Sequence, residues 1–131
     1  MNLASMPFGD SPGRWKSVRM AEGQAEMAWT PTPDMSNPVG NVHGGVIATI
    51  IDEVTGAAVM SAIDAGSAPT VSMHVEYLHP IPIGGSYTAV GEIVRKGRAL
   101  AIVDARILSE EGTVLARGTC MFQIPRPKQP S

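Results

Sequence analysis

The sequence lacks several features that would assign its class at once. It has a single cysteine, Cys120, which excludes an intrachain disulfide framework and makes a reducing cytoplasm the expected location. It has no apolar run long enough to span a membrane and no early apolar run behind a basic lead, so we expect neither a membrane segment nor a signal peptide. Charged residues make up only 17% of the chain and the formal net charge is −2, which gives no reason to expect a nucleic-acid partner.

Histidine is scarce as well, and so are repeats. The three histidines lack the ligand spacing of a recognised zinc site, so no metal is expected; they are His43, His74 and His79. No internal repeat or low-complexity tract divides the 131 residues, a length that suits one domain with a real core. We therefore expect a single domain over residues 1–131, with loosely ordered tails at 1–14 and 125–131.

The most informative stretch that is present covers residues 37–62. Turn residues come first, and Gly44–Gly45 would begin a helix that ends between Ala62 and Gly66. Apolar residues then occupy nearly every side of that helix, which is typical of a buried helix. Asp52 and Glu53 interrupt the apolar pattern, and an ionised carboxylate there costs free energy unless something pairs with it.

Asp52 lies on a narrow stripe of small residues. Residues three and four apart share a helix face, so Gly45, Thr49 and Gly56 lie beside it. Such a stripe leaves room for a ligand or another backbone to come close. The alternative is that Asp52 is a solvated helix residue whose small neighbours arise by chance.

The residues before the helix supply hydrogen-bond donors. Backbone N–H groups at a helix start are unpaired, and glycine at Gly44 lets an oxygen approach them, as a thioester carbonyl would when it gains negative charge. Asn37 can donate to the same group or orient a water, and His43 can contact a substrate. In the alternative interpretation Asn37 is only a turn former and His43 only anchors the loop.

The rest of the chain has the patterns of strands. Between Thr70 and Leu78, apolar residues alternate with polar ones, which places Thr70 on the polar face with Ser72, His74 and Glu76. Gly91 is expected to mark a bulge in its strand. The expected strands are residues 15–19, 24–30, 70–78, 86–95, 98–108 and 113–124. With no second helix to cover it, the apolar helix must be wrapped by this sheet.

The motif N-x-x-G-x-x-H-G-G, followed seven residues later by aspartate, resembles the signature of hotdog-fold acyl-CoA thioesterases of the phenylacetate-pathway type. Its residues here are Asn37, Gly40, His43, Gly44, Gly45 and Asp52. The segments T-V-S-M-H-V-E-Y-L-H-P and V-R-K-G-R-A-L fit as well, so the resemblance covers roughly residues 24–124. It implies an α+β hotdog fold, in which a curved antiparallel β-sheet wraps a long central helix.

The resemblance also implies an activity, the hydrolysis of an acyl-CoA thioester without any cofactor beyond the substrate. Asp52 would attack the carbonyl directly or activate a water that does so, and the sequence does not choose between the two. The Gly44 N–H would polarise the carbonyl, while Asn37 and His43 would position substrate or water. Thr70 aligns with a hydroxyl residue that, in related enzymes, helps to hold the attacking group. Glu53 is turned about a quarter of the way round the helix and is expected to be structural.

Coenzyme A carries phosphates, and the chain offers a basic turn near which the family binds CoA. Arginine and lysine both suit phosphate, although a solvated hairpin tip is the alternative. The candidate CoA contacts are Arg95, Lys96, Gly97 and Arg98, with Tyr77 from the preceding strand. The small residues Ala48, Gly56 and Ala57 would leave room for an aryl or medium-chain acyl group.

The family pairs through edge strands, so a homodimer and a homotetramer are implied. Each active site would lie at the dimer interface, where the loop before Gly44 of one subunit meets Asp52 of the other. Two alternatives remain: a hydratase or dehydratase on the same fold, and a non-catalytic domain that binds or senses acyl-CoA. The Asn37 and Asp52 pattern favours hydrolysis over the first, and the carboxylate itself argues against the second.

Overall fold

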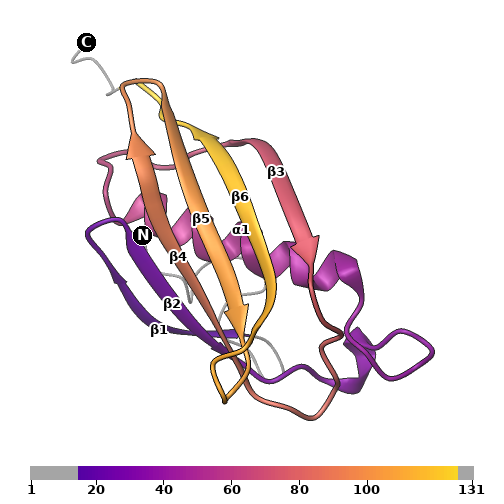
Figure 1. The fold of residues 1–131 in the computed structure, drawn as a ribbon. Coiled ribbons are helices and arrows are strands. Elements are labelled where there is room, and N and C mark those ends of the chain that lie inside the picture. The colour runs from indigo at the N-terminus through magenta and orange to yellow at the C-terminus, as the bar shows by residue number, and fades with distance from the viewer. Residues whose placement is uncertain (1–14, 127–131) are drawn as a thin grey trace.

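A computed structural model describes residues 15–126 of the chain. Over these residues the sequence forms one α-helix, one short 3-10 helix and six strands (Figure 1). The bounds are β1 Trp15–Ala21, β2 Gln24–Trp29, η2 Pro33–Met35, α1 Gly44–Met60, β3 Thr70–Tyr77, β4 Tyr87–Lys96, β5 Leu100–Leu108 and β6 Val114–Gln123. The expected tail at 1–14 lies outside the described residues, as does the part of the second tail beyond residue 126.

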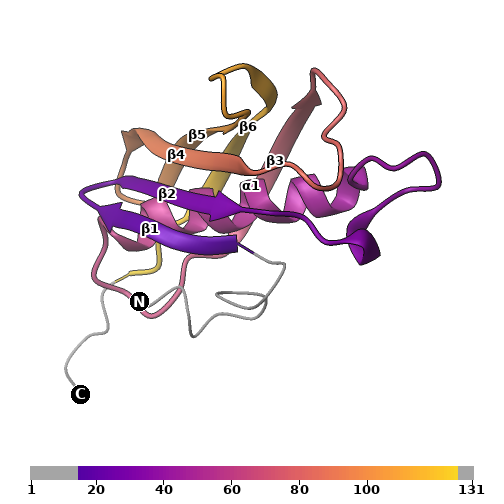
Figure 2. The ribbon, with the colours of Figure 1, turned by 90° about the horizontal axis from the view of Figure 1, so that it is seen from below.

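All six strands form a single antiparallel sheet in the order β1-β2-β4-β5-β6-β3. The sheet curves around α1, which lies in its hollow (Figure 2). The predicted α+β arrangement of a long helix wrapped by a curved sheet is therefore confirmed. Within the segment that the structure describes, no helix is both long and apolar enough to cross a membrane.

The helix is held close to the sheet because small residues line the contact. A Cβ atom added at Gly91 would lie 2.8 Å from the carbonyl oxygen of Val54, so only glycine fits there. The predicted bulge at Gly91 is wrong, since Gly91 stands in regular register opposite Ala105. The irregularity in β4 falls instead between Ile93 and Arg95. Gly91 is needed for close packing, not for a break in the ladder.

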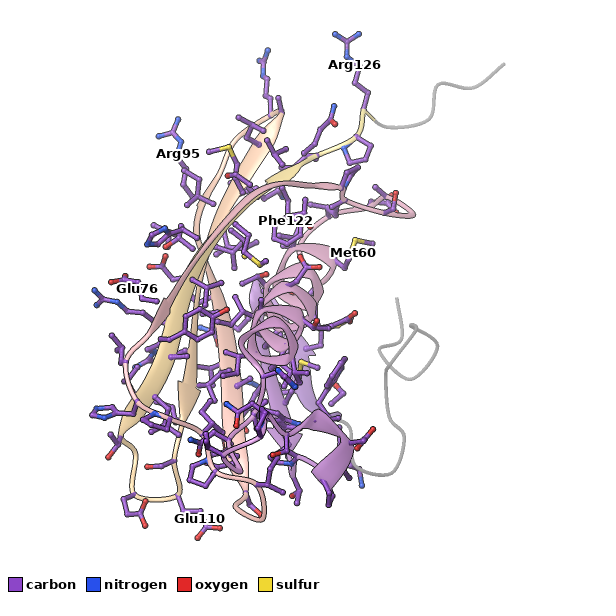
Figure 3. The ribbon with its side chains drawn as sticks, turned by 90° about the vertical axis from the view of Figure 1, so that its right-hand side faces the viewer. Met60, Glu76, Arg95, Glu110, Phe122 and Arg126 are labelled. Atoms are coloured by element: carbon purple, nitrogen blue, oxygen red, sulfur yellow. The ribbon has the colours of Figure 1, made fainter. Side chains whose placement is uncertain are left out.

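β3 also contains a bulge, and this bulge changes which way Thr70 faces. Thr70 stands opposite Phe122 and Ser72 opposite Met121, so Val71 is an extra residue in the ladder. Phe122 is buried between sheet and helix (Figure 3), and Thr70 shares its face. The prediction that Thr70 lies on the polar face with Ser72 is therefore wrong, because the inserted residue reverses the alternation.

Three apolar residues of β3 are exposed, whereas Val75 is partly buried against the core. Val71, Met73 and Tyr77 are 54%, 42% and 53% exposed, and β3 is an edge of the sheet. An edge strand presents unpaired backbone groups, so β3 offers both hydrogen-bonding groups and apolar side chains to a partner.

Candidate active site

The start of α1 carries backbone N–H groups that have no helical carbonyl as a partner. The N–H groups of Val46 and Ile47 donate to the His43 carbonyl oxygen at 3.0 and 3.2 Å. Gly44 and Gly45 precede them, where no helical carbonyl is available as a partner. His43 is exposed at the N-cap, and its own N–H donates to the Met35 carbonyl oxygen at 2.9 Å. The backbone of His43 thus anchors the loop, and its imidazole faces solvent.

Asn37 shapes the site loop, which we define as residues 37–43. Its side-chain Oδ1 accepts hydrogen bonds from the N–H groups of Val39 and Asn41, at 3.0 and 3.1 Å. Its backbone N–H donates to the Asn41 carbonyl oxygen at 2.7 Å. The amide oxygen is used within the loop, so any bond from Asn37 to a substrate has to come from its NH2 group.

Tyr77 holds the helix start in place. Its hydroxyl donates to the Gly44 carbonyl oxygen at 2.8 Å. A Cβ atom at Gly44 would lie 3.3 Å from the Tyr77 ring, so glycine allows this close contact. The structure therefore positions Tyr77 at the beginning of α1, together with the site loop.

Asp52 is half-buried and has a hydrogen-bonded partner. Its Oδ1 accepts a hydrogen bond from the Thr70 hydroxyl at 2.9 Å. The bulge in β3 makes this contact because it turns Thr70 towards the helix. Two residues predicted from separate parts of the sequence are thus brought together.

Glu53, the neighbouring carboxylate, lies in a different environment from Asp52. Its pKa is raised to about 7, mainly by burial and to a smaller extent by the nearby charge of Asp52. Its Oε2 atom is buried without a hydrogen-bond partner among the described residues. A structural role is expected for Glu53 from the sequence, and within the described part of the chain its Oε2 atom makes no hydrogen bond that would support this role.

Asp52 and Gly44 do not meet within one chain. Asp52 lies eight residues after Gly44 in the same helix, which corresponds to about 12 Å along the axis. A nucleophile and an oxyanion donor must both lie within about 3 Å of the reacting atoms. We call the Asp52–Thr70 pair the acid end of β3, and Gly44–Tyr77 with the site loop the loop end.

The basic turn lies at the acid end. Lys96 pairs with Ala101, Ala101 with Phe122, and Phe122 with Thr70, so the turn shares one end of the sheet with Thr70. Lys96 Nζ donates to the Ala62 carbonyl oxygen at 2.9 Å. The side chains of Arg95 and Arg98 are exposed, and the Gly97 N–H closes the turn on the Leu100 carbonyl oxygen at 2.8 Å. Tyr77, which is predicted from the sequence to contact CoA together with this turn, lies at the opposite end of β3.

A groove that is not predicted from the sequence lies at the loop end, although residues of the signature motif and of the segment 70–80 line it. It has a volume of about 440 Å³ and runs between the site loop and residues 77–81. The residues expected to shape the acyl site lie elsewhere: Ala57 is fully buried in the core, and Gly56 faces the Phe122 ring. No group of three potential metal-ligating side chains occurs among the residues that the structure describes.

A family model described as the thioesterase superfamily matches residues 39–116. The chain belongs to the thioesterase superfamily. The match includes the helix start, Asp52 and Thr70, so both ends of β3 lie within the family region. The thioesterase fold present here is the hotdog fold, which the solved structures similar to it share.

Individual relatives of this thioesterase-superfamily chain are distant. Human acyl-coenzyme A thioesterase 13 is 22% identical over 107 residues, 81% of this chain and 76% of that protein. A hypothetical thioesterase from Streptococcus pneumoniae, solved with coenzyme A, is 26% identical with a TM-score of 0.80 over 88% of this chain and 89% of that one. A Streptococcus mutans protein bound to acetyl-CoA is 22% identical with a TM-score of 0.82, over 95% of this chain and 99% of its own.

Proposed function

We propose that this protein hydrolyses the thioester of an aryl- or medium-chain acyl-CoA, with Asp52 as nucleophile or general base. The observation that carries the proposal is the half-buried Asp52 carboxylate held by Thr70 at 2.9 Å. A carboxylate fixed by a hydroxyl is suited to attack or to proton abstraction. The named thioesterase among the relatives and the one solved with CoA support this substrate class. The signature motif favours the phenylacetate-pathway type.

Each site is proposed to need two subunits. The separation of Asp52 and Gly44 along α1 rules out a shared carbonyl within one chain. Antiparallel pairing of two β3 edges about a two-fold axis near Met73 would set Thr70 opposite Tyr77 of the partner subunit. The acid end of one chain then faces the loop end of the other, which gives two sites per homodimer. A homotetramer and a cytoplasmic location complete the proposal.

Two chemical routes are open to this arrangement. In the first, Asp52 takes a proton from water, the water oxygen bonds to the carbonyl carbon, the C–S bond breaks, and the CoA thiolate takes up the proton. In the second, the carboxylate itself attacks, CoA leaves, and water hydrolyses the mixed anhydride. In both routes the Gly44 N–H of the other subunit stabilises the oxyanion, while Asn37 and His43 lie beside the substrate.

The basic turn is proposed to bind the CoA phosphates. Arg95 and Arg98 are exposed and offer forked donors, whereas Lys96 is engaged with the Ala62 carbonyl. The backbone of Gly97 shapes the turn. This turn lies at the acid end, so the CoA moiety would be bound mainly by the subunit that supplies Asp52.

Thiol release from a panel of acyl-CoAs, with short, medium, long and aromatic acyl groups, tests the proposal. Asp52→Asn and Asp52→Ala are expected to lower kcat by about 10²- to 10⁴-fold, the usual contribution of an acid–base group, while binding of the CoA ester is retained. Asp104→Asn is the matched control, because Asp104 accepts a hydrogen bond from Thr119 on the outer face of the sheet. Unchanged turnover in Asp52→Ala would disprove the role of Asp52.

The two alternatives give other results in the same assay. A sensor domain would bind acyl-CoA without releasing thiol from any ester. A hydratase would consume the double bond of an enoyl-CoA while the thioester stays intact. Thiol release by the parent protein that depends on Asp52 excludes both.

A further inference from the structure

The groove at the loop end has a mainly apolar lining with an apolar base. Its lining residues are Asn37, Asn41, Val42, Gly44, Ile47, Tyr77, Leu78, His79, Pro80 and Ile81. Three of them, Val42, Ile47 and Ile81, are buried core residues at the base of the groove. Leu78 is 45% exposed and is therefore free to contact a ligand. None of the lining side chains is an arginine, lysine or carboxylate, so the groove suits an uncharged, mainly apolar group.

Backbone hydrogen bonds fix both walls. The Val42 N–H donates to the Ile81 carbonyl oxygen at 2.8 Å, which ties the site loop to the segment after β3. The N–H groups of Leu78 and His79 both donate to the Leu115 carbonyl oxygen at 3.0 Å. The groove is thus preformed, and side-chain size at its wall can set what fits.

The groove begins at the proposed oxyanion donor. Gly44 is itself a lining residue, and Tyr77 holds its carbonyl. In an acyl thioester the first carbon of the acyl chain is bonded directly to the carbonyl carbon. A carbonyl oxygen placed on the Gly44 N–H therefore puts the acyl chain at the mouth of this groove.

We propose that the groove binds the acyl group and that Leu78 determines the acyl size. The inference rests on the proposed function, since it takes Gly44 as the carbonyl's binding partner. Each methylene buried in an apolar groove is expected to raise kcat/KM about fourfold until the groove is full. A group with a carboxylate at its far end is disfavoured, because the lining residues include no cation to pair with it.

The test measures kcat/KM for straight-chain acyl-CoAs of increasing length and for phenylacetyl-CoA. Leu78→Trp fills the groove and is expected to lower kcat/KM for medium-chain and aryl esters about tenfold or more while acetyl-CoA changes little. Leu78→Ala widens the groove and is expected to shift the preferred chain to greater length. Val18→Trp is the control, because Val18 is 57% exposed on β1, the opposite edge of the sheet.

Identical chain-length profiles for the parent and both Leu78 variants would overturn the groove assignment and leave the thioesterase proposal standing. Absence of hydrolysis of any ester would overturn the thioesterase proposal instead. The groove is then tested by calorimetric binding of alkyl-CoA thioethers, which cannot be hydrolysed. Affinity that rises with chain length and falls in Leu78→Trp supports the groove, and affinity independent of length overturns it.

Discussion

At the acid end of β3 the geometry is made by two side chains, whereas at the loop end it is made by the main chain. Thr70 and Asp52 meet through a hydroxyl and a carboxylate. At the other end, Asn37 and Tyr77 use their side chains to hold backbone groups of the site loop and of Gly44. The acid end thus carries a hydrogen-bonded carboxylate, and the loop end presents backbone donors. About 12 Å of helix separates Gly44 from Asp52 within one chain, and this separation supports the proposal that each site combines the two ends from different subunits.

The largest expected effect comes from putting one defect at each end. Asp52→Ala removes the reactive group, and Gly44→Val forces a side chain against the Tyr77 ring and the incoming carbonyl. Each variant alone is expected to be inactive. Mixed and reassociated, the two are expected to regain about a quarter of the parent activity, because half of the dimers carry one intact site of their two. Thiol release measured before and after mixing checks this.

Two controls make that result decisive. Mixing Asp52→Ala with itself after the same treatment is expected to restore nothing. A mixture of the two variants that stays inactive, although mass spectrometry shows mixed dimers, would overturn the proposal that each site combines Asp52 of one subunit with Gly44 of the other.

A pair of single-hydroxyl deletions compares the two ends directly. Thr70→Val removes a hydrogen bond to a charged group and is expected to lower kcat/KM about tenfold or more, because such bonds contribute about 1.5–3 kcal/mol. Tyr77→Phe removes a bond between neutral groups and is expected to lower it only about threefold. Steady-state kinetics on one acyl-CoA measures both. Equal losses of kcat/KM in the two variants would contradict the view that the hydrogen bond to the charged Asp52 carboxylate matters more than the bond to the neutral Gly44 carbonyl.

The sequence predicts which residues form the acid end and the loop end, but not the direction in which each side chain points. The apolar helix, the order of the elements and the small residues at the helix–sheet contact follow from periodicity, because burial imposes those patterns. The orientation of Thr70 does not, since the segment alternates apolar and polar residues without a break. The register against β6 inserts Val71 as an extra residue, and only the pairing partner determines that.

Two other features depend on contacts that are distant in sequence. Position 91 requires glycine because a Cβ atom there would collide with the Val54 carbonyl on the helix. From the sequence alone, a glycine within a strand pattern is interpreted as a bulge. The groove combines the site loop with residues 77–81, which are joined by the bond between Val42 and Ile81. The proposed two-subunit site follows from the sequence only through the family resemblance, and the separation of Asp52 and Gly44 along α1 supports it.

The basic turn tests which end binds CoA. Arg98→Ala is expected to raise KM for acyl-CoA several-fold with little change in kcat, because an exposed guanidinium is free to pair with phosphate. Lys96→Ala is the comparison, since Lys96 Nζ is bound to the Ala62 carbonyl and should affect thermal stability more than KM. The Arg98 effect should also shrink at high ionic strength. An unchanged KM in Arg98→Ala would mean that the basic turn at the acid end does not bind CoA.

The smallest expected effect is on stability and concerns the second carboxylate beside the acid end. Burial and the Asp52 charge raise the pKa of Glu53 from 4.5 to about 7 in the folded protein. The folded state therefore holds this proton more tightly than the unfolded chain does. Its stabilising contribution is present in full below about pH 4.5 and is lost as pH rises through about 7.

Glu53→Gln keeps the shape of the side chain and removes the titration. Thermal unfolding between pH 5 and pH 8 is expected to show a Tm that falls with pH in the parent and falls less in the variant, so that the variant is relatively more stable at pH 8. Asp52→Asn removes the smaller cause of the raised pKa of Glu53 and keeps burial, the larger one, so the fall in Tm between pH 5 and pH 8 is expected to be only slightly smaller in that variant than in the parent. Parallel Tm curves for the parent and Glu53→Gln would mean that Glu53 is ionised in the fold like an exposed carboxylate, and that the acid end carries no second titrating group.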